Sequence, residues 1–348
     1  MSGSARQRPA QRGSALALRP MQVAVTGSIA TDHLMTFAGR FADSLVVEQL
    51  DKISLSFLVE SLQIRRGGCA ANIAFGMANL GQRPLLVGAV GADFEDYRSW
   101  LERHGVDCDS IHTSETEHTA RFVCTTDVDM AQIATFYSGA MAEAREIELQ
   151  PIAERVGGLD LVLVGPNDPV AMDRHTEECR TRGIPFAADP SQQLARVDGE
   201  AIRTLIDGAA YLFTNEYESH MISQKAGWSE RDIAQHVGVQ ITTQGKDGAT
   251  IRQQGHDPIH VDVIPGINPL DPTGVGDSFR SGFLTGLAAG LPHQRCAELG
   301  SALAAYVIET VGTQEYVLTQ SSLLDRLAQA YGENSAADIG DRIRCPRP

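Results

Sequence analysis

The chain has 348 residues, 43% of them hydrophobic, and a formal net charge of −15. This length and composition predict one large α/β domain, or a domain with a smaller companion, rather than a disordered chain. The acidic balance, without a dense Lys/Arg cluster beyond the N-terminal tail, argues against a nucleic-acid partner, because proteins that bind phosphate backbones present a basic face.

Residues 1–20 form a segment rich in Arg, Ser, Ala and Gln that contains no acidic residue. This composition predicts a disordered extension. It is similar in composition to an organelle transit peptide but lacks amphipathic periodicity, so we interpret it as an extension that precedes Met21. Its only apolar run is too short for a signal peptide, and no later segment predicts a membrane span. We therefore expect a protein that is not exported and has no membrane partner.

From Met21 onward, short apolar runs alternate with segments that are compatible with helices. This alternation predicts a mostly parallel sheet flanked by helices, in a domain that spans residues 21–333. The predicted strands lie at 23–26, 84–90, 159–164, 184–188, 210–213, 239–242 and 260–264. Residues 334–348 are rich in Ala, Asp and Arg, and we expect them to fray.

Two stretches, residues 33–64 and about 110–137, interrupt this alternation. They lack long helical periodicity and contain β-branched or alternating residues, as in Ile53–Phe57 and Arg121–Thr126. We expect strands of a small separate sheet, which would act as a lid over the carboxyl-terminal edge of the main sheet. Ligands of open α/β folds bind at that edge.

Several common sites are missing from the sequence. Neither G-x-x-x-x-G-K-[ST] nor a strand-linked G-x-G-x-x-G occurs, which argues against a P-loop nucleotidase and a dinucleotide-binding Rossmann enzyme. The six cysteines form no C-x-x-C pair and the ten histidines show no ligand spacing, so neither disulfides nor a zinc site are predicted. Reduced thiols of this kind are typical of the cytoplasm.

Two adjacent glycines, Gly67 and Gly68, precede a predicted helix that contains Asn72. Glycines at such a turn let substrate hydroxyls reach the backbone. An Asn amide donates and accepts hydrogen bonds at once, which suits the vicinal hydroxyls of a sugar. A turn that leads into an Ala-rich packing helix explains the residues equally well.

A second glycine cluster places Gly274 and Gly276 directly before Asp277, at a predicted helix start. Unpaired N–H groups at a helix N-terminus attract anions, and glycine lets a phosphate approach them closely. Asp277 would then hold a proton acceptor beside an arriving phosphoryl group. The segment therefore predicts a phosphoryl-transfer site.

The helix that follows this cluster is supported by an apolar repeat at Phe279, Phe283 and Leu287. The alternative interpretation is a capped packing helix, with Asp271 as N-cap and Pro272 at the first helical position. On either interpretation, we expect Asp271 and Pro272 to start the helix.

Together and in this order, these segments resemble the signatures of the PfkB, or ribokinase-like, family of carbohydrate kinases. The resemblance covers residues 21 to 330 and includes Thr26–Asp32 after the first strand and Asn215–Glu218, which is similar to the family's N-x-x-E motif. It implies a three-layer α/β/α domain with a small β-sheet lid. Three further stretches look most like bacterial adenosine kinases of actinobacteria, namely Ala120–Phe122, Asp127–Gln132 and Asp189–Gln193.

The resemblance implies catalysis by placement and electrostatics. Asp277 is expected to take the proton of the sugar 5′-hydroxyl. The backbone N–H groups of Gly274, Val275 and Gly276 are expected to stabilise charge on the transferring phosphoryl.

The resemblance also implies an ATP and magnesium site. Asn215 and Glu218 would organise Mg²⁺, with Glu218 acting through water because Mg²⁺ keeps much of its hydration shell. The stretch from Thr243 to Gly248 resembles the family's ATP-phosphate loop, in which Lys246 could instead face solvent. An ordinary hairpin turn around Asp247 and Gly248 is the alternative. The residues expected to contact ATP are Asn215, Thr243, Gln244, Gly245, Lys246, Asp247, Gly248 and Gly276.

For the nucleoside, the resemblance implies that Asp32 holds substrate hydroxyls. Phe122 and Phe136 supply apolar faces for a purine, although lid packing would explain them equally well. The residues expected to bind substrate are Ser28, Asp32, Gly68, Asn72, Phe122, Phe136, Gln192, Gln193 and Asp277.

The leading hypothesis is a cytoplasmic, ATP-dependent adenosine kinase that produces AMP and ADP in purine salvage. Another sugar or nucleoside kinase of the family, acting on ribose or guanosine, is the alternative. A non-catalytic nucleoside sensor is a remote third, because a sensor needs neither a base, nor an anion hole, nor an N-x-x-E motif.

The resemblance also implies a homodimer through the lid sheets. The resemblance also implies that a monovalent cation such as K⁺ could bind near the anion hole.

Overall fold

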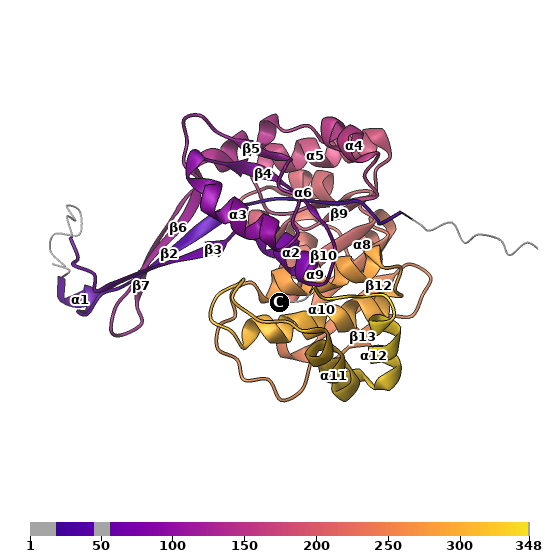
Figure 1. The fold of residues 1–348 in the computed structure, drawn as a ribbon. Coiled ribbons are helices and arrows are strands. Elements are labelled where there is room, and N and C mark those ends of the chain that lie inside the picture. Colours follow the sequence, from indigo (N-terminus) through magenta and orange to yellow (C-terminus); the bar gives the residue numbers. More distant parts are fainter. Residues whose placement is uncertain (1–18, 45–55, 347–348) are drawn as a thin grey trace, which may run out of the picture.

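The computed structural model describes residues 19–44 and 56–346. An α/β body carries most of these residues, and a small sheet projects from it (Figure 1). The predicted extension at residues 1–20 lies almost entirely outside the described part. Within that part, no helix has the length and apolar character to cross a membrane.

The main sheet has nine strands in the order β13-β12-β11-β10-β9-β8-β1-β4-β5. Neighbours are parallel from β11 through to β5, whereas β12 and β13 join in antiparallel fashion. This confirms the mostly parallel sheet. The strands are β1 (Val23–Thr26), β4 (Leu85–Val90), β5 (Ile111–Thr113), β8 (Leu161–Val164), β9 (Phe186–Ala188), β10 (Tyr211–Asn215), β11 (Val239–Thr243), β12 (Ala249–Gln253) and β13 (Ile259–Val261).

Helices cover both faces of this sheet. Alternate residues of β1 point into two separate apolar cores: Val23 and Val25 lie in one core, and Ala24 lies in the other. The first face packs against α2 (Cys69–Asn79), α3 (Glu95–Arg103), α9 (Val275–Ala288), α10 (His293–Ile308), α11 (Gln320–Tyr331) and α12 (Glu333–Gly340). The second packs against α4 (Leu149–Val156), α5 (Pro169–Arg182), α6 (Gly199–Ile206), α7 (Glu216–Ala226) and α8 (Glu230–His236). The three layers are confirmed. Short elements are α1 (Phe41–Ser44), η2 (Ala92–Phe94), η3 (Gly139–Glu146), η4 (Ser191–Ala195) and η5 (Gly245–Asp247).

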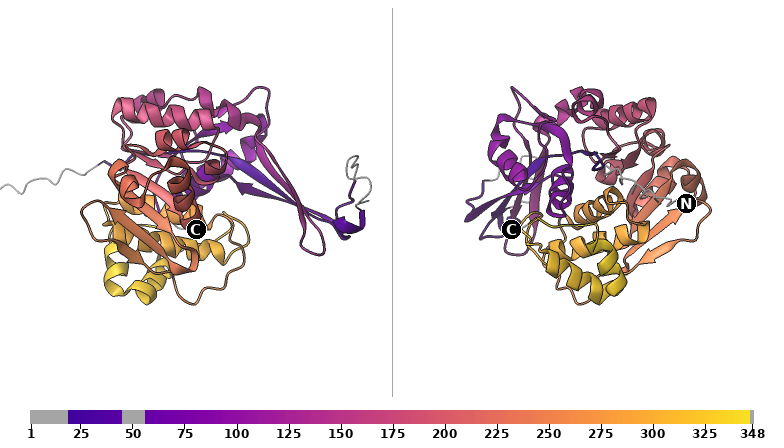
Figure 2. Two further views of the ribbon diagram at one scale, coloured as in Figure 1. Left: turned by 180° about the vertical axis from the view of Figure 1, so that it is seen from behind. Right: turned by 45° about the vertical axis from the view of Figure 1, so that its right-hand side comes forward.

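The small sheet has four strands in the order β3-β2-β6-β7, and Figure 2 shows it projecting from the body. Its strands are β2 (Ala30–Thr36), β3 (Ser61–Gly67), β6 (Ala120–Thr126) and β7 (Gln132–Tyr137). The separate sheet was therefore predicted correctly. Two details differ: β5 pairs with β4 of the main sheet instead of joining the lid, and Phe57 packs against the rings of Phe37 and Phe41 outside any strand. Residues 53–55 lie outside the described residues.

The expected fraying of residues 334–348 is wrong for most of that segment. Helix α12 covers its first part, and the side chains of Ala336, Ile339 and Ile343 are buried in the core. Ala336 and Ile339 lie three residues apart on one face of α12, and Ile343 follows the end of this helix. The abundant Ala, Asp and Arg around them conceal this periodicity in the composition.

Candidate active site

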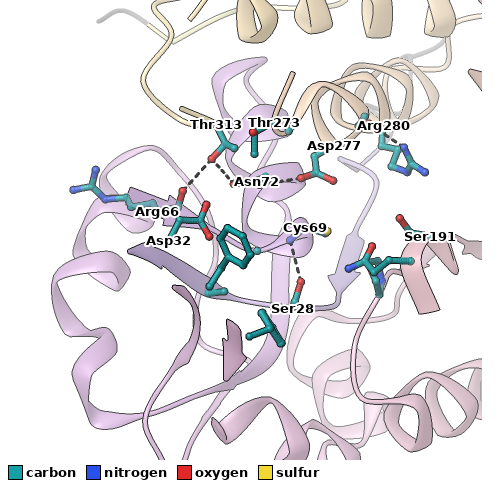
Figure 3. A pocket seen from close by; sticks show the side chains of 18 of the residues that line it. Ser28, Asp32, Arg66, Cys69, Asn72, Ser191, Thr273, Asp277, Arg280 and Thr313 are labelled. Atoms are coloured by element: carbon teal, nitrogen blue, oxygen red, sulfur yellow. Dashed lines mark hydrogen bonds between the residues drawn. The ribbon is translucent and has the colours of Figure 1, made fainter. Parts of the chain in front are cut away.

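A cavity of about 690 Å³ opens where the parallel strands of the main sheet end. Its body side is lined by residues that follow successive strands, and its outer side by the small sheet (Figure 3). This is the edge at which open α/β sheets bind ligands. Of the predicted site residues, the cavity wall includes Ser28, Asp32, Gly68, Asn72, Phe122, Phe136, Gln192, Gln193, Asn215, Glu218, Thr243, Gly274, Gly276 and Asp277.

The N-terminus of α9 forms one wall of this cavity. Its N-cap, Gly274, has a left-handed φ of 75°, and no side chain caps this helix end. The first-turn N–H groups, which have no partner inside a helix, therefore remain free to meet an anion. Val275 differs from the other two residues of the predicted anion hole. It does not line the cavity, and its N–H donates to the carbonyl oxygen of Pro272 at 3.4 Å.

Asp271 and Pro272 do not start this helix, contrary to expectation. The helix begins at Val275, because the left-handed turn at Gly274 separates Pro272 from the helical residues. Asp271 instead accepts hydrogen bonds from the N–H groups of Thr273 (2.9 Å) and Gly312 (3.0 Å). It therefore joins two loops at the cavity rim.

Asp277 lies in the first turn of α9 and is half-buried, with its open side on the cavity. Asn72 donates from Nδ2 to its Oδ2 at 2.9 Å. Burial raises the pKa of Asp277 from 3.8 to about 6, although the Asn72 hydrogen bond and the charge of Arg280 oppose this shift. A carboxylate with a pKa just below neutrality is ionised at pH 7 and still has substantial affinity for a proton, as a general base requires.

Asn72 is placed differently from the expectation that it would both donate to and accept from a sugar. Its Oδ1 already accepts hydrogen bonds from Thr313 Oγ1 (2.9 Å) and Gln314 Nε2 (3.0 Å). Gln314 holds one lone pair of this oxygen, and Thr313 lies against the other, although the single Thr313 hydrogen can also go to the carbonyl oxygen of Arg66. Only the second N–H of its amide remains for a substrate hydroxyl.

The glycine pair before α2 has two different tasks. Gly68 has a φ of 92°, and a Cβ there would lie 2.6 Å from the carbonyl oxygen of Ser28, so the turn requires glycine. Gly67 does not line the cavity; a Cβ on it would come within 2.9 Å of Asp32 Oδ2. The turn therefore leads into a packing helix and also leaves space for the Asp32 carboxylate.

The lid side of the cavity is built from a row of residues across the small sheet. Asp32 is paired in register with Arg65 on β3 and with Phe122 on β6, and Phe122 is paired with Phe136 on β7. Cross-strand partners point to the same face of a sheet, so all four line the cavity. Burial raises the pKa of Asp32 to about 6, against the opposing charge of Arg65.

The two predicted glutamines lie after β9. Gln192 is exposed on the cavity wall, whereas Gln193 is buried and donates from Nε2 to the carbonyl oxygen of Asn167 at 2.8 Å. Because a backbone carbonyl only accepts, this bond fixes the orientation of the Gln193 amide. Its Oε1 has no partner within the described ranges.

Asn215 and Glu218 form the capping box of α7. Glu218 N–H donates to Asn215 Oδ1 and Asn215 N–H donates to Glu218 Oε2, both at 2.8 Å. Both residues also line the cavity. Glu218 Oε1 has only a 3.5 Å contact with Ser191 Oγ, and burial raises the pKa of Glu218. One carboxylate oxygen therefore remains available on this wall.

The predicted ATP-phosphate loop is a hairpin connection between β11 and β12. Thr243 reaches the cavity wall, whereas Gln244, Gly245, Lys246, Asp247 and Gly248 are absent from it. The hairpin alternative therefore describes the backbone correctly, and Lys246 is exposed to solvent.

Sequence reasoning missed the buried ion pair beside Asp277. Arg280, one turn after Asp277 on α9, donates from Nη2 to Asp189 Oδ1 at 2.7 Å, and both side chains are almost fully buried. Burial opposes the charge of Arg280, but Asp189 raises the pKa of this guanidinium. An arginine next to Phe279, inside an apolar helix repeat, was the available signal.

Comparison with known proteins agrees with this geometry. Residues 28–320 match the model of the pfkB family carbohydrate kinases. The chain is 30% identical to a nucleoside kinase of Methanothermobacter thermautotrophicus over 82% of this chain and 92% of that protein. A Burkholderia thailandensis nucleoside kinase solved with inosine has a TM-score of 0.78 and 34% identity, covering 89% of this chain and 99% of that one. The Methanocaldococcus jannaschii nucleoside kinase structure has a TM-score of 0.76 and 26% identity, with coverage of 89% and 99%.

The family model covers most of the chain, and the two solved nucleoside kinases share its fold over 89% of its length. The chain therefore belongs to the pfkB family of carbohydrate kinases. It is accordingly a phosphotransferase.

Proposed function

We propose that this chain is an adenosine kinase, which transfers the γ-phosphate of ATP to the 5′-hydroxyl of adenosine and releases AMP and ADP. The observation that carries the proposal is the position of Asp277, at an open helix N-terminus in a cavity that also contains Asp32, Phe122 and Phe136. The nucleoside kinases among its relatives, one of them solved with ADP and inosine, support a nucleoside acceptor and an adenine-nucleotide donor. We place the reaction in cytoplasmic purine salvage, which is consistent with six free cysteines.

In this proposal the ribose lies between Asp32 and Asp277. Asp32 accepts from the ribose hydroxyls, and the remaining N–H of Asn72 donates to one of them. Asp277 removes the proton of the 5′-hydroxyl as that oxygen attacks the γ-phosphate. The free N–H groups of Gly274 and Gly276 stabilise the charge on the transferring phosphoryl.

Magnesium fits the wall that carries Glu218, because one oxygen of that carboxylate is uncommitted. Among the residues described, no group of three or more His, Cys, Asp or Glu could enclose a metal ion. This suits Mg²⁺, which keeps several waters and takes further ligands from substrate phosphates. Bound there, the ion would neutralise phosphate charge, and Asn215 would hold Glu218 in place.

The preference for adenosine among nucleosides rests on Gln193. Among the described residues, its buried Oε1 has no hydrogen-bond partner, and the bond from Nε2 to the carbonyl oxygen of Asn167 fixes which end of the amide is the acceptor. The 6-amino group of adenine is a donor and would satisfy it, whereas the 6-oxo group of hypoxanthine or guanine would not. Phe122 and Phe136 provide the apolar faces on which the purine would lie.

Inosine is the second candidate acceptor, since a relative at 34% identity was solved with it. The N1–H of hypoxanthine is also a donor, and a small shift of the base would bring it to Gln193 Oε1. Inosine is therefore expected to be a poorer substrate than adenosine but not an inactive one.

A substrate panel tests this proposal. With ATP as donor, we expect kcat/KM to be highest for adenosine, about tenfold or more lower for inosine and guanosine, and lower still for ribose and fructose 6-phosphate, which lack the purine. Coupled ADP release measures all five reactions. A higher kcat/KM for ribose or a sugar phosphate would contradict the nucleoside assignment, and a higher value for inosine would contradict the role of Gln193.

We also propose a homodimer through the small sheets. The face opposite the Asp32 row carries Leu62, Ile64 and Ile133, whose side chains are 55%, 61% and 46% exposed. An exposed apolar sheet face of this kind is normally covered by another surface.

Light scattering is expected to give twice the chain mass of 37.5 kDa at micromolar concentration. The double variant Leu62→Glu and Ile64→Glu should shift the protein to monomer. Val317→Glu, which alters an apolar side chain that is 72% exposed on the body, should not. A monomeric wild type would contradict the dimer.

A further inference from the structure

A partly buried chain of hydrogen bonds runs from α3 to Asp277. Trp100 Nε1 donates to Gln314 Oε1 at 3.1 Å, Gln314 Nε2 donates to Asn72 Oδ1 at 3.0 Å, and Asn72 Nδ2 donates to Asp277 Oδ2 at 2.9 Å. Gln314 is only 1% exposed and does not line the cavity. It therefore touches Asn72 from behind, on the side away from any substrate. The Asn72 end of this chain is drawn in Figure 3.

The direction of every bond in this chain follows from its first member. An indole N–H can only donate, so the Gln314 carbonyl must face Trp100. The Gln314 amide nitrogen then faces Asn72 and the Tyr97 hydroxyl, to which it donates at 2.6 Å, while Tyr97 donates onward to the Gly67 carbonyl oxygen at 3.1 Å. With its Oδ1 held by Gln314, the Asn72 amide can only present its NH₂ group to Asp277.

We propose that Gln314 is a positioning residue for phosphoryl transfer, because it holds the Asn72 amide with its NH₂ edge toward the Asp277 carboxylate. The inference rests on the proposed role of Asp277 as base. A reversed Asn72 amide would place a carbonyl oxygen against the carboxylate, where neither atom has a hydrogen to share. The carboxylate would then turn away or take up a proton, and in either case it would no longer accept the 5′-hydroxyl proton.

Thr313 does not replace Gln314 in this role. Its Oγ1 lies 2.9 Å from Asn72 Oδ1 and 3.0 Å from the carbonyl oxygen of Arg66. A hydroxyl has one hydrogen, so Thr313 can serve only one of these acceptors at a time. It could also accept from a reversed Asn72 amide, and it therefore selects neither orientation.

The other groups around Asp277 do not select the orientation of Asn72 either. Asp277 is faced by Cys69 and Asn72 from α2, by Arg280 from its own helix and by Asp189 from the loop after β9. The charged groups nearest Tyr97, at the other end of the chain, are Arg66, Asp32 and Glu315. None of them makes a hydrogen bond to the Asn72 amide in the structure apart from Asp277 itself.

The test compares Gln314→Glu with Gln314→Met in kcat and in the pH dependence of kcat/KM. The Glu variant cannot donate to Asn72 and attracts its NH₂ group, so we expect kcat to fall about tenfold or more. The acid limb of the pH profile should move upward by about one pH unit, because Asp277 loses a stabilising donor. The Met variant removes the donor without attracting the reversed amide, and we expect a smaller change in the same direction.

Two further variants separate positioning from general stability. Gln240→Met alters another glutamine that is 3% exposed, which bonds to Ser219 away from the cavity; it should lower the melting temperature without moving the pH profile. Trp100→Phe keeps an aromatic ring but removes the N–H that orients Gln314. It is expected to shift the profile like Gln314→Met, and it provides the test if the Gln314 variants do not fold.

The same assays with Asp277→Asn separate the positioning role of Gln314 from the role of Asp277 as base. If Asp277→Asn is inactive while the folded Gln314 or Trp100 variants keep the wild-type pH profile, the positioning role is wrong and the base stands. If Asp277→Asn keeps wild-type activity, the base assignment itself is wrong. An inactive Asp277→Asn together with shifted profiles supports both.

Discussion

Replacing Asp277 with Asn is expected to lower kcat about 10³-fold, because an amide cannot take the proton of the 5′-hydroxyl. Asn is nearly the same size, and its side-chain oxygen can still accept the hydrogen bond from Asn72 Nδ2. Nucleoside and ATP affinities, measured by calorimetry, should therefore change little. Activity near the wild-type level would contradict the assignment of Asp277 as base.

The pH dependence of this site has a definite sign. Burial holds the pKa of Asp277 at about 6 in the folded protein, so wild-type kcat/KM should fall as the pH drops through 6 and the base becomes protonated. The pKa of Asp277 is about 4 in the unfolded chain and higher in the folded protein, so ionisation of Asp277 lowers the free energy of unfolding. This loss develops between about pH 4 and pH 6 and is complete above pH 6. At about pH 7.5, Asp277→Asn should consequently unfold at the same or a higher temperature than the wild type.

Gly274→Ala is expected to lower kcat about 10²-fold or more by disturbing the helix N-terminus that we propose stabilises the transferring phosphoryl. A Cβ at this position would lie 2.7 Å from Cγ2 of Thr313, and the φ of 75° disfavours any side chain. The start of α9 would have to move, and with it the free N–H groups. Steady-state kinetics with ATP and adenosine measure the effect.

Gly266→Ala is the matched control for this variant. Gly266 has a similar φ of 72°, but a Cβ there would have no neighbour within 4 Å. Both variants therefore introduce the same backbone strain, of about 1 kcal/mol, and only Gly274→Ala adds the contact with Thr313. Equal losses of kcat in both would show that strain, not displacement of the helix start, is responsible.

The layered body was predictable from the sequence, because buried parallel strands appear as short apolar runs between helical segments. Strand β12 and helix α12 were missed. Strand β12 lies next to β11 near one end of the sheet. The apolar face of α12 is difficult to recognise in the sequence because Ala, Asp and Arg surround it. Local composition does not report which surface a segment will meet.

The position of Gly274, Gly276 and Asp277 at a helix start was also predictable, because the three residues lie within four positions of one another in the sequence. The placement of Asn72 was not. Its expected contact with a sugar is changed by Thr313 and Gln314, which lie more than 240 residues further along the chain.

The sequence by itself determined the parts of this protein that depend on neighbouring residues: most of the parallel strands of the main sheet, the glycines next to Asp277, and the family to which the chain belongs. Only the tertiary structure decided which groups meet in space. It aligned Asp32, Phe122 and Phe136 across three strands, buried Arg280 against Asp189, and placed Gln314 behind Asn72. The physical reason is that these contacts depend on strand register and helix packing between distant segments, which no local pattern of residues specifies.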